Sequence, residues 1–377
     1  MTTTWRAARL ALGTACALGF ARFAYGLLIP GMREDLHWTL AQAGAVSTAN
    51  GLGYLLGAIA TAAAVHRWGV ATVFRTSMIA TTITLTATAT DDTIAVQAIV
   101  RALAGVSGAA VFVTGGIIAA RMAAEADSGT PITIYFSGTG LGIILSGSTV
   151  PFLDGRWQAA SIGMGIAAGV ATLACWTAAR GSEAPVAEGT GRVQVRGLRT
   201  VVVAYFLFAA GYISYITFLS VYLDHRHASN AEAALVWTVL GAAVMAAPLV
   251  WSRPIADWRG TRALTAVLGA HACGAALALL PSSSEVWIAS AAIYGATFMT
   301  VAAAVTARIR AVVPPESWTT TLAAFTTVFA AGQMLGPWLA GLLADRTSTT
   351  AAVVWTVALC AAAAAITAIP IRSRTTP

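Results

Sequence analysis

The chain has 377 residues, of which 58% are hydrophobic and only 10% charged, with a formal net charge of +7. Soluble globular domains do not reach this balance, and the basic excess lacks the interleaved aromatic residues of a nucleic-acid-binding segment. We therefore exclude both classes, expect no nucleic-acid partner, and predict an all-α protein that crosses the lipid bilayer many times.

The first predicted span runs from about residue 7 to residue 31 and carries an arginine near its middle. Along a helix, Arg22 would lie about 15 Å from Met32 and about 20 Å from Arg9, too far to reach water by extending its side chain. An unpaired guanidinium in lipid would cost about 2.5 to 3.5 kcal/mol. We therefore expect Arg22 to face a polar chamber inside the protein, with Tyr25 one turn further on nearly the same face.

Eleven further apolar segments follow, separated by short polar loops. Their predicted bounds are about 41–65, 70–90, 93–121, 131–153, 157–179, 201–223, 233–251, 263–280, 286–309, 318–343 and 350–371. Between spans six and seven the composition shifts to Gly, Glu, Pro and Arg, which is typical of a linker. We therefore predict an N-terminal six-helix bundle at 1–180, a connector at 181–199 and a C-terminal six-helix bundle at 200–377.

An internal repeat relates the two predicted bundles. Residues 41–51 match residues 231–241 at a shift of 190, and Gly105 falls on Gly295 at the same shift. Parallel repeats of this kind place a transporter's binding site between the two halves, near the middle of the membrane. In the overlay Arg22 corresponds to Ser214, so the charge occurs in one half only.

The arginines of the loops indicate an orientation. Four of them, Arg33, Arg156, Arg226 and Arg346, fall on one side of the membrane, and the sixteen others outside the spans fall on the other. Because cytoplasmic loops carry the basic excess, we predict that both termini are cytoplasmic and that the chain is a multi-pass protein of the bacterial inner or plasma membrane.

Two loops carry related motifs. The loop after span two has Arg67 and Gly69, with a histidine where the pattern Gly-x-x-x-Asp-Arg-x-Gly-x-Arg has its aspartate, and the corresponding second-half loop has Asp257, Gly260 and Arg262. With the twelve spans and the repeat, these motifs make the whole chain resemble a transporter of the major facilitator superfamily.

Further motifs refine the resemblance. Arg101-x-x-x-Gly105 in span four resembles the superfamily's fourth-helix motif, whereas span five lacks the Gly-Pro of the antiporter signature. The sequences Gly19-x-x-Arg22-Phe23-x-Tyr25, Gly53-Tyr54-Leu55-Leu56-Gly57 and Gly336-Pro337-x-x-x-Gly341 are most similar to the YbfB/YjiJ-like branch.

The resemblance implies secondary transport by alternating access, with coupling or gating roles for Arg101, Arg67, Asp257 and Arg262. A structural bond from Arg101 to backbone carbonyls is an equal alternative. Asp257 with Arg262 is expected to latch the cytoplasmic face, and the alternative is a solvated turn.

Several polar and aromatic residues are candidates for the wall of the chamber: Asn50, Tyr54, Tyr212, Tyr215, Tyr294 and Gln333. For the amides the alternative is a bridge between helices, and for the tyrosines it is packing in the core.

No aspartate or glutamate lies in the middle of a predicted span, so the predicted interior is cationic. We therefore predict a small organic anion, such as a carboxylate, bound at Arg22. It would move by exchange with a counter-anion or together with a proton carried on the ligand. His271 is the one mid-span residue of a type that relays protons, and we interpret it as a tolerated polar residue.

Two other functions remain as alternatives: an exporter of amphipathic toxic compounds with a structural Arg22, and a membrane sensor that does not transport. Short loops and the lack of a soluble domain disfavour the sensor. We expect no enzyme activity, because neither a nucleophile constellation nor a phosphate-binding loop occurs. The four cysteines lack metal-ligand spacing, so we expect neither metal nor cofactor, and we expect a monomer.

Overall fold

The computed structural model describes residues 3–179, 193–195, 197–280 and 283–369, and the regular structure of this part of the chain is helical. The helices are α1 (Thr3–Thr14), the π-helix η1 (Ala15–Phe23), α2 (Tyr25–Leu36), α3 (Leu40–Trp68), α4 (Val70–Ala87), α5 (Ile94–Glu125), α6 (Thr130–Thr149), the 3-10 helix η2 (Val150–Leu153), α7 (Trp157–Cys175), α8 (Arg199–His225), α9 (Asn230–Asp257), α10 (Arg262–Leu277), α11 (Ser284–Val312), the 3-10 helix η3 (Pro315–Ser317), α12 (Trp318–Arg346) and α13 (Thr350–Ala368).

These helices make the predicted membrane spans. In the described residues eleven helical segments are long and apolar enough to cross a membrane, and α10 is a shorter apolar helix at the position of predicted span nine. The first span, Thr3–Leu36, joins α1, η1 and α2. The predicted all-α membrane fold is thereby confirmed, while most of the predicted connector at 181–199 lies outside the described residues.

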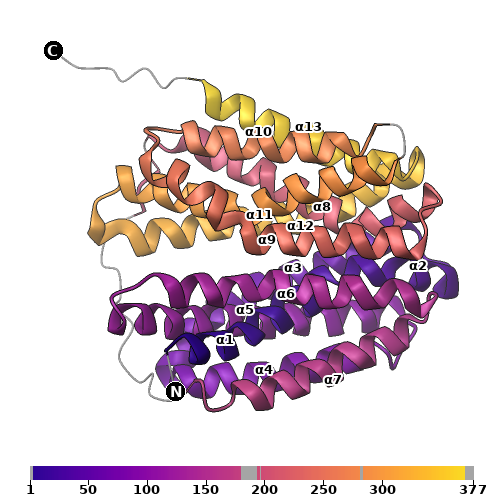
Figure 1. Ribbon diagram of the computed structural model, residues 1–377, viewed down its shortest axis with the longest axis horizontal. Coiled ribbons are helices and arrows are strands. Elements are labelled where there is room, and N and C mark those ends of the chain that lie inside the picture. Colours follow the sequence, from indigo (N-terminus) through magenta and orange to yellow (C-terminus); the bar gives the residue numbers. More distant parts are fainter. Residues whose placement is uncertain (1–2, 180–192, 196, 281–282, 370–377) are drawn as a thin grey trace.

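The helices form two groups, which we call the first half (α1 to α7) and the second half (α8 to α13). Figure 1 shows the first half below the second. The principal contacts between them pair α3 with α12, α6 with α9, and α2 with α8. We call the end of the bundle where α1 begins the terminal end, and the opposite end, where α3 and α9 begin, the far end.

Equivalent helices of the two halves begin in the same way. Thr39 and Gln42 form a capping box at the start of α3, and Ser229 and Glu232 form one at the start of α9. Both members of the second box lie 190 residues after their counterparts. Such a box satisfies backbone N–H groups that the first helical turn leaves free, so the repeat sets where the two helices start.

The repeat also preserves a close helix contact. A Cβ atom at Gly105 of α5 would overlap the carbonyl oxygen of Asn50 on α3, and one at Gly295 of α11 would overlap that of Leu240 on α9. Each residue of the second pair again lies 190 positions after its counterpart. Glycine at both positions lets the helix backbones approach closely, so the same packing is built twice.

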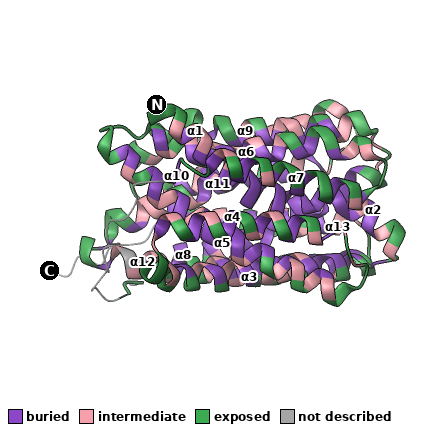
Figure 2. Cartoon of the chain, turned by 90° about the horizontal axis from the view of Figure 1, so that it is seen from below, coloured by how far each residue is buried: buried purple, intermediate pink, exposed green. Residues whose placement is uncertain are grey.

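The outer surface of the bundle is apolar. Leu249 on α9 is 87% exposed and Leu173 on α7 is 75% exposed, and Figure 2 shows exposed residues on the outer faces of helices around a buried interior. Water would oppose this arrangement, whereas lipid chains solvate such side chains. The exposed leucines therefore lie where a bilayer would contact the bundle.

Candidate functional site

A π-helix sets the position of Arg22. In η1 the N–H of Ala24 donates to the carbonyl oxygen of Gly19, five residues earlier, at 2.9 Å. π-Helical turns inside α-helices are rare and occur frequently at functional sites. We find no pattern in the sequence that predicts this turn within the first span.

Arg22 lies where the two halves meet. Its guanidinium donates a hydrogen bond to Oε1 of Gln333 on α12, and the hydroxyl of Tyr212 on α8 donates to the same oxygen at 2.8 Å. On the other side, the guanidinium carbon is 4.8 Å from the ring centre of Tyr54 on α3. Arg22 is only partly buried. The structure thus brings four of the predicted residues together from both halves.

The partners of Arg22 are neutral. Among the described residues it contacts the Gln333 amide oxygen and the Tyr54 ring, and it makes no ion pair with an aspartate or glutamate. A cation–π contact and one amide hydrogen bond stabilise the guanidinium but leave its charge uncompensated. The site therefore keeps a net positive charge between the halves.

A group of stacked aromatic rings lies beside this charge. Phe329 on α12, which is partly buried, stacks on Tyr205 with ring centres 4.8 Å apart and on Tyr212 at 5.6 Å. Phe208 also stacks on Tyr212, with ring centres 4.9 Å apart. The sequence analysis missed Tyr205, Phe208 and Phe329. Helical spacing could have found all three, because Tyr205 and Phe208 precede the predicted Tyr212 by seven and four residues, and Phe329 lies four residues before Gln333.

Arg101 is a second cation of the first half, and it is enclosed. It is 2% exposed, its Nη1 donates to the carbonyl oxygen of Ala21 at 2.8 Å, and its guanidinium lies 4.0 Å from the ring centre of Tyr25. Its contact is thus with the π-helical turn beside Arg22. The bond to a backbone carbonyl matches the structural alternative for Arg101, and its coupling role stays a prediction.

Two predicted wall residues are used inside the first half. The Tyr25 hydroxyl donates to the carbonyl oxygen of Ala43 at 3.1 Å, and Nδ2 of Asn50 donates to the carbonyl oxygen of Arg101 at 3.0 Å. Both side chains are buried. Each one therefore joins neighbouring helices, and neither contacts Arg22.

Two further predicted wall residues pack inside the second half. The Tyr215 hydroxyl is 2.8 Å from the hydroxyl of Ser290, the Tyr294 hydroxyl donates to the carbonyl oxygen of Tyr212, and the rings of Tyr215 and Tyr294 stack 4.0 Å apart. His271 lies against Tyr294 and is fully buried. These side chains therefore hold helices of the second half together, and they do not contact Arg22.

The predicted gating residues of the terminal end are exposed. Asp257 and Arg262 line one shallow cleft, together with Trp258, and Arg67 lies at the end of α3. Asp257 and Arg262 make no ion pair with each other in the part of the chain that the structure describes. The latch formed by these residues stays a prediction.

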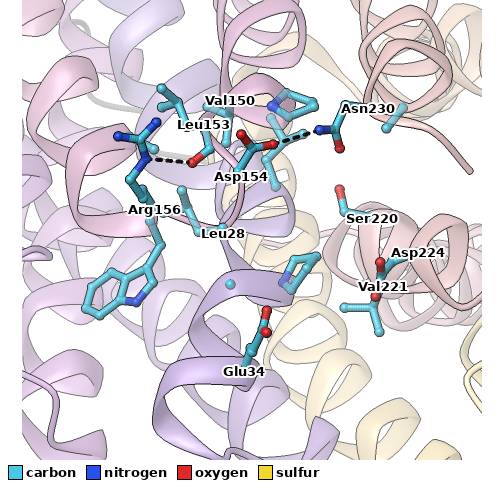
Figure 3. A pocket seen from close by; sticks show the side chains of 18 of the residues that line it. Leu28, Glu34, Val150, Leu153, Asp154, Arg156, Ser220, Val221, Asp224 and Asn230 are labelled. Atoms are coloured by element: carbon cyan, nitrogen blue, oxygen red, sulfur yellow. Dashed lines mark hydrogen bonds between the residues drawn. The ribbon is translucent and has the colours of Figure 1, made fainter.

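A cavity of about 640 Å³ lies between the halves at the far end and not at Arg22. Its lining includes Asp154, Ser220, Asp224 and Asn230 (Figure 3). Between this cavity and Arg22, α2 meets α8 so closely that a Cβ atom at Gly26 would overlap the backbone of α8. The cavity and the Arg22 site are thus separated by a packed seam.

Solved structures with the same arrangement of helices are transporters. The chain is similar to the nucleoside transporter NupG, with a TM-score of 0.77 and 14% identity, over 98% of this chain and 100% of that one. It is similar to a point mutant of NupG with a TM-score of 0.80 and 13% identity, over 97% of this chain and 100% of that one. It is also similar to a bacterial homologue of the human lysosomal transporter Spinster in an inward-facing, unoccupied conformation. The TM-score is 0.67 and the identity 15%, over 98% of this chain and 96% of that one.

No curated protein matches the sequence. The family model described as "Uncharacterised MFS-type transporter YbfB" matches residues 14–372. This match covers nearly the whole chain and agrees with the helix arrangement of the solved transporters. The chain therefore belongs to the YbfB family of major facilitator superfamily transporters.

Proposed function

We propose that this transporter carries a small organic anion, such as a carboxylate, bound at Arg22 between the two halves. The observation that carries the proposal is a partly buried guanidinium at the junction of the halves whose described partners are all neutral. In a site of low dielectric constant an uncompensated charge attracts a counter-charge more strongly than in water. A ligand carboxylate would supply that charge.

The geometry of Arg22 suits a carboxylate. A guanidinium presents parallel N–H groups that match the two oxygens of a carboxylate, and this paired contact is stronger than a bond to a neutral amide. Gln333 supplies one neutral oxygen to the guanidinium. A bound carboxylate would therefore replace Gln333 as the better acceptor, and the freed amide could donate to the ligand.

Alternating access follows from the position of Arg22 between two repeats. The seam at Gly26 closes the side of Arg22 that faces the far end, which supports a chamber that opens towards the terminal end. We propose that this end is cytoplasmic and that a counter-anion or a proton on the ligand completes the cycle.

A second candidate is an uncharged or amphipathic substrate with a planar ring, and Arg22 then has a structural role. The stacked rings of Tyr205, Phe208, Tyr212 and Phe329 favour it, because aromatic faces stack on planar ligands. Both NupG structures are of a nucleoside transporter, and nucleosides have this shape. An exporter of amphipathic toxic compounds belongs to the same class.

Transport by the purified protein in liposomes separates the candidates. We expect benzoate, an aromatic carboxylate, to be carried and to raise the thermal unfolding midpoint, and Arg22→Gln to lower transport about 10- to 100-fold, the range for loss of a hydrogen bond to a charged group. Arg346→Gln, the same change at an exposed position, is the matched control. Undiminished benzoate transport by Arg22→Gln, or carriage of uridine alone, would refute the anion proposal.

A further inference from the structure

Two aspartates join the halves at the far end. Asp345, at the end of α12, accepts hydrogen bonds from the backbone N–H groups of Leu40 and Ala41, each at 2.8 Å. Asp154, which follows η2, accepts one from the side-chain amide of Asn230 at 3.0 Å (Figure 3). In each case the aspartate of one half binds the first turn of a helix in the other half.

The two contacts are related by the internal repeat. Asn230 lies 190 residues after Leu40, and Asp345 lies 191 residues after Asp154. Each half therefore contributes one aspartate and one helix start, at equivalent positions. We call these contacts the Asp345 clasp (with Leu40 and Ala41) and the Asp154 clasp (with Asn230).

The chemistry of the clasps suits a contact that must form and break. In the Asp345 clasp the carboxylate accepts from the first backbone N–H groups of α3, which have no partner within the helix and carry a partial positive charge. In the Asp154 clasp the carboxylate accepts from the side-chain amide of Asn230, the first residue of α9. Both aspartates are exposed, which means that water can replace the carboxylate when the halves separate. The Asp345 clasp has two charge-assisted bonds and the Asp154 clasp has one, so we expect the former to be stronger.

The clasps lie over the seam that separates Arg22 from the far end. In this seam the hydroxyls of Ser47 on α3 and Thr217 on α8 are 3.2 Å apart, and α2 packs closely against α8 at Gly26. The cavity of about 640 Å³ outside the seam is lined by both members of the Asp154 clasp. The path from Arg22 to this cavity is therefore closed where the clasps hold the halves together.

We propose that the Asp345 and Asp154 clasps are the gate of the far end and that they must break before Arg22 becomes accessible from that side. The gate holds the starts of α3 and α9 in place and needs no contact with the substrate. It is therefore independent of what the Arg22 site binds.

Labelling of a cysteine in the seam tests the gate. Thr217 is 3% exposed, so Thr217→Cys in the full-length protein should react slowly with a bulky maleimide. Adding Asp345→Ala should raise the labelling rate about fivefold. This is the factor by which the loss of one helix cap would raise the ratio of open to closed protein at the far end. Asp154→Ala should raise the labelling rate less than Asp345→Ala does, and the double variant Asp345→Ala with Asp154→Ala should raise it most. Asp345→Asn keeps one acceptor oxygen, so its labelling rate should lie between those of the wild-type aspartate and Asp345→Ala.

Asp35→Ala is the matched control, because Asp35 is also exposed at the far end but accepts its hydrogen bond from Trp157 within the first half. Each clasp variant without Thr217→Cys corrects for labelling of the native Cys273, which is exposed. Equal rates for Asp345→Ala and Asp35→Ala, in samples with unchanged unfolding midpoints, would overturn the gate. No substrate is added, so this failure would leave the anion proposal untouched.

Discussion

The two halves share a backbone plan but differ in chemistry. Their helices start with equivalent capping boxes and cross at equivalent glycines. The first half contributes both cations that lie within a span, Arg22 and Arg101, whereas the equivalent positions of the second half are Ser214 and Ala291. The second half contributes Gln333 and the stacked rings. The repeat therefore preserves the helix starts and the glycine crossings, which we call the frame. The Arg22 site lies where the two halves present different side chains to each other.

The contrast between the repeated helix contacts and the one-sided Arg22 site can be tested by mutation. Changes in the duplicated frame should have matching effects in the two halves, because the contacts are equivalent. Changes at the site should not match, because a given side chain has no counterpart.

The glycine crossings test the frame most severely. Gly105→Ala and Gly295→Ala each place a methyl group against a backbone carbonyl, so we expect each to lower the stability by about 1 to 3 kcal/mol, seen as a lower unfolding midpoint in detergent. Gly163→Ala and Gly269→Ala add the same methyl group where space is open and should have little effect. A loss confined to one half would contradict the shared frame.

Arg101→Lys tests the one-sided cation. Lysine keeps the charge but loses the planar fork that lies on Tyr25 and reaches the carbonyl of Ala21. We expect a loss of about 1 to 2 kcal/mol in stability, less than the full value of a hydrogen bond to a charged group because the lysine ammonium can still donate one bond. Transport should also weaken, because the turn that holds Arg22 shifts. Arg346→Lys is the control. Wild-type stability and transport in Arg101→Lys would show that the fork is not required.

Gln333→Glu tests the junction between the halves. It would give Arg22 a permanent carboxylate, so a substrate anion must displace a charged partner, and we expect its affinity to fall about tenfold. Gln333→Leu removes the acceptor without adding a charge and should leave anion binding within a few-fold of wild type. Titration of benzoate by thermal shift measures both variants. Tighter binding of benzoate by Gln333→Glu would be incompatible with a carboxylate at Arg22.

The capping boxes should give the smallest effect. Thr39→Ala and Ser229→Ala each remove one acceptor for a backbone N–H, and we expect both to lower the stability by about 1 kcal/mol. Thr347→Ala, at the exposed end of α12, is the comparison for a threonine outside a helix start. Clearly unequal losses at Thr39 and Ser229 would indicate that the two helix starts are not equivalent.

The frame could be predicted from the sequence to a large extent. Apolar runs of sufficient length set the spans, and the shift of 190 relates the halves without any knowledge of contacts, because both can be read from the sequence. The depth of Arg22 followed from counting residues along a helix. Four of the eight predicted wall residues, Arg22, Tyr54, Tyr212 and Gln333, meet at one place.

The other wall residues show what such counting cannot provide. Tyr25 lies one turn after Arg22, yet its ring lies against Arg101 and its hydroxyl reaches α3. Asn50 likewise binds the backbone of α5. The direction of a side chain depends on which neighbouring helix offers a partner, and spacing along one helix does not contain that information.

Hydropathy and repeat spacing are readable in one dimension, so the sequence alone predicts that this chain crosses a membrane in two related halves and that one deep cation needs a polar environment. The contact of Arg22 with Gln333, 311 residues away, and the contact of Asp345 with the start of α3 are visible only in the folded chain. Both contacts join segments whose separation in sequence is large, and packing of the two halves alone brings them within hydrogen-bond distance.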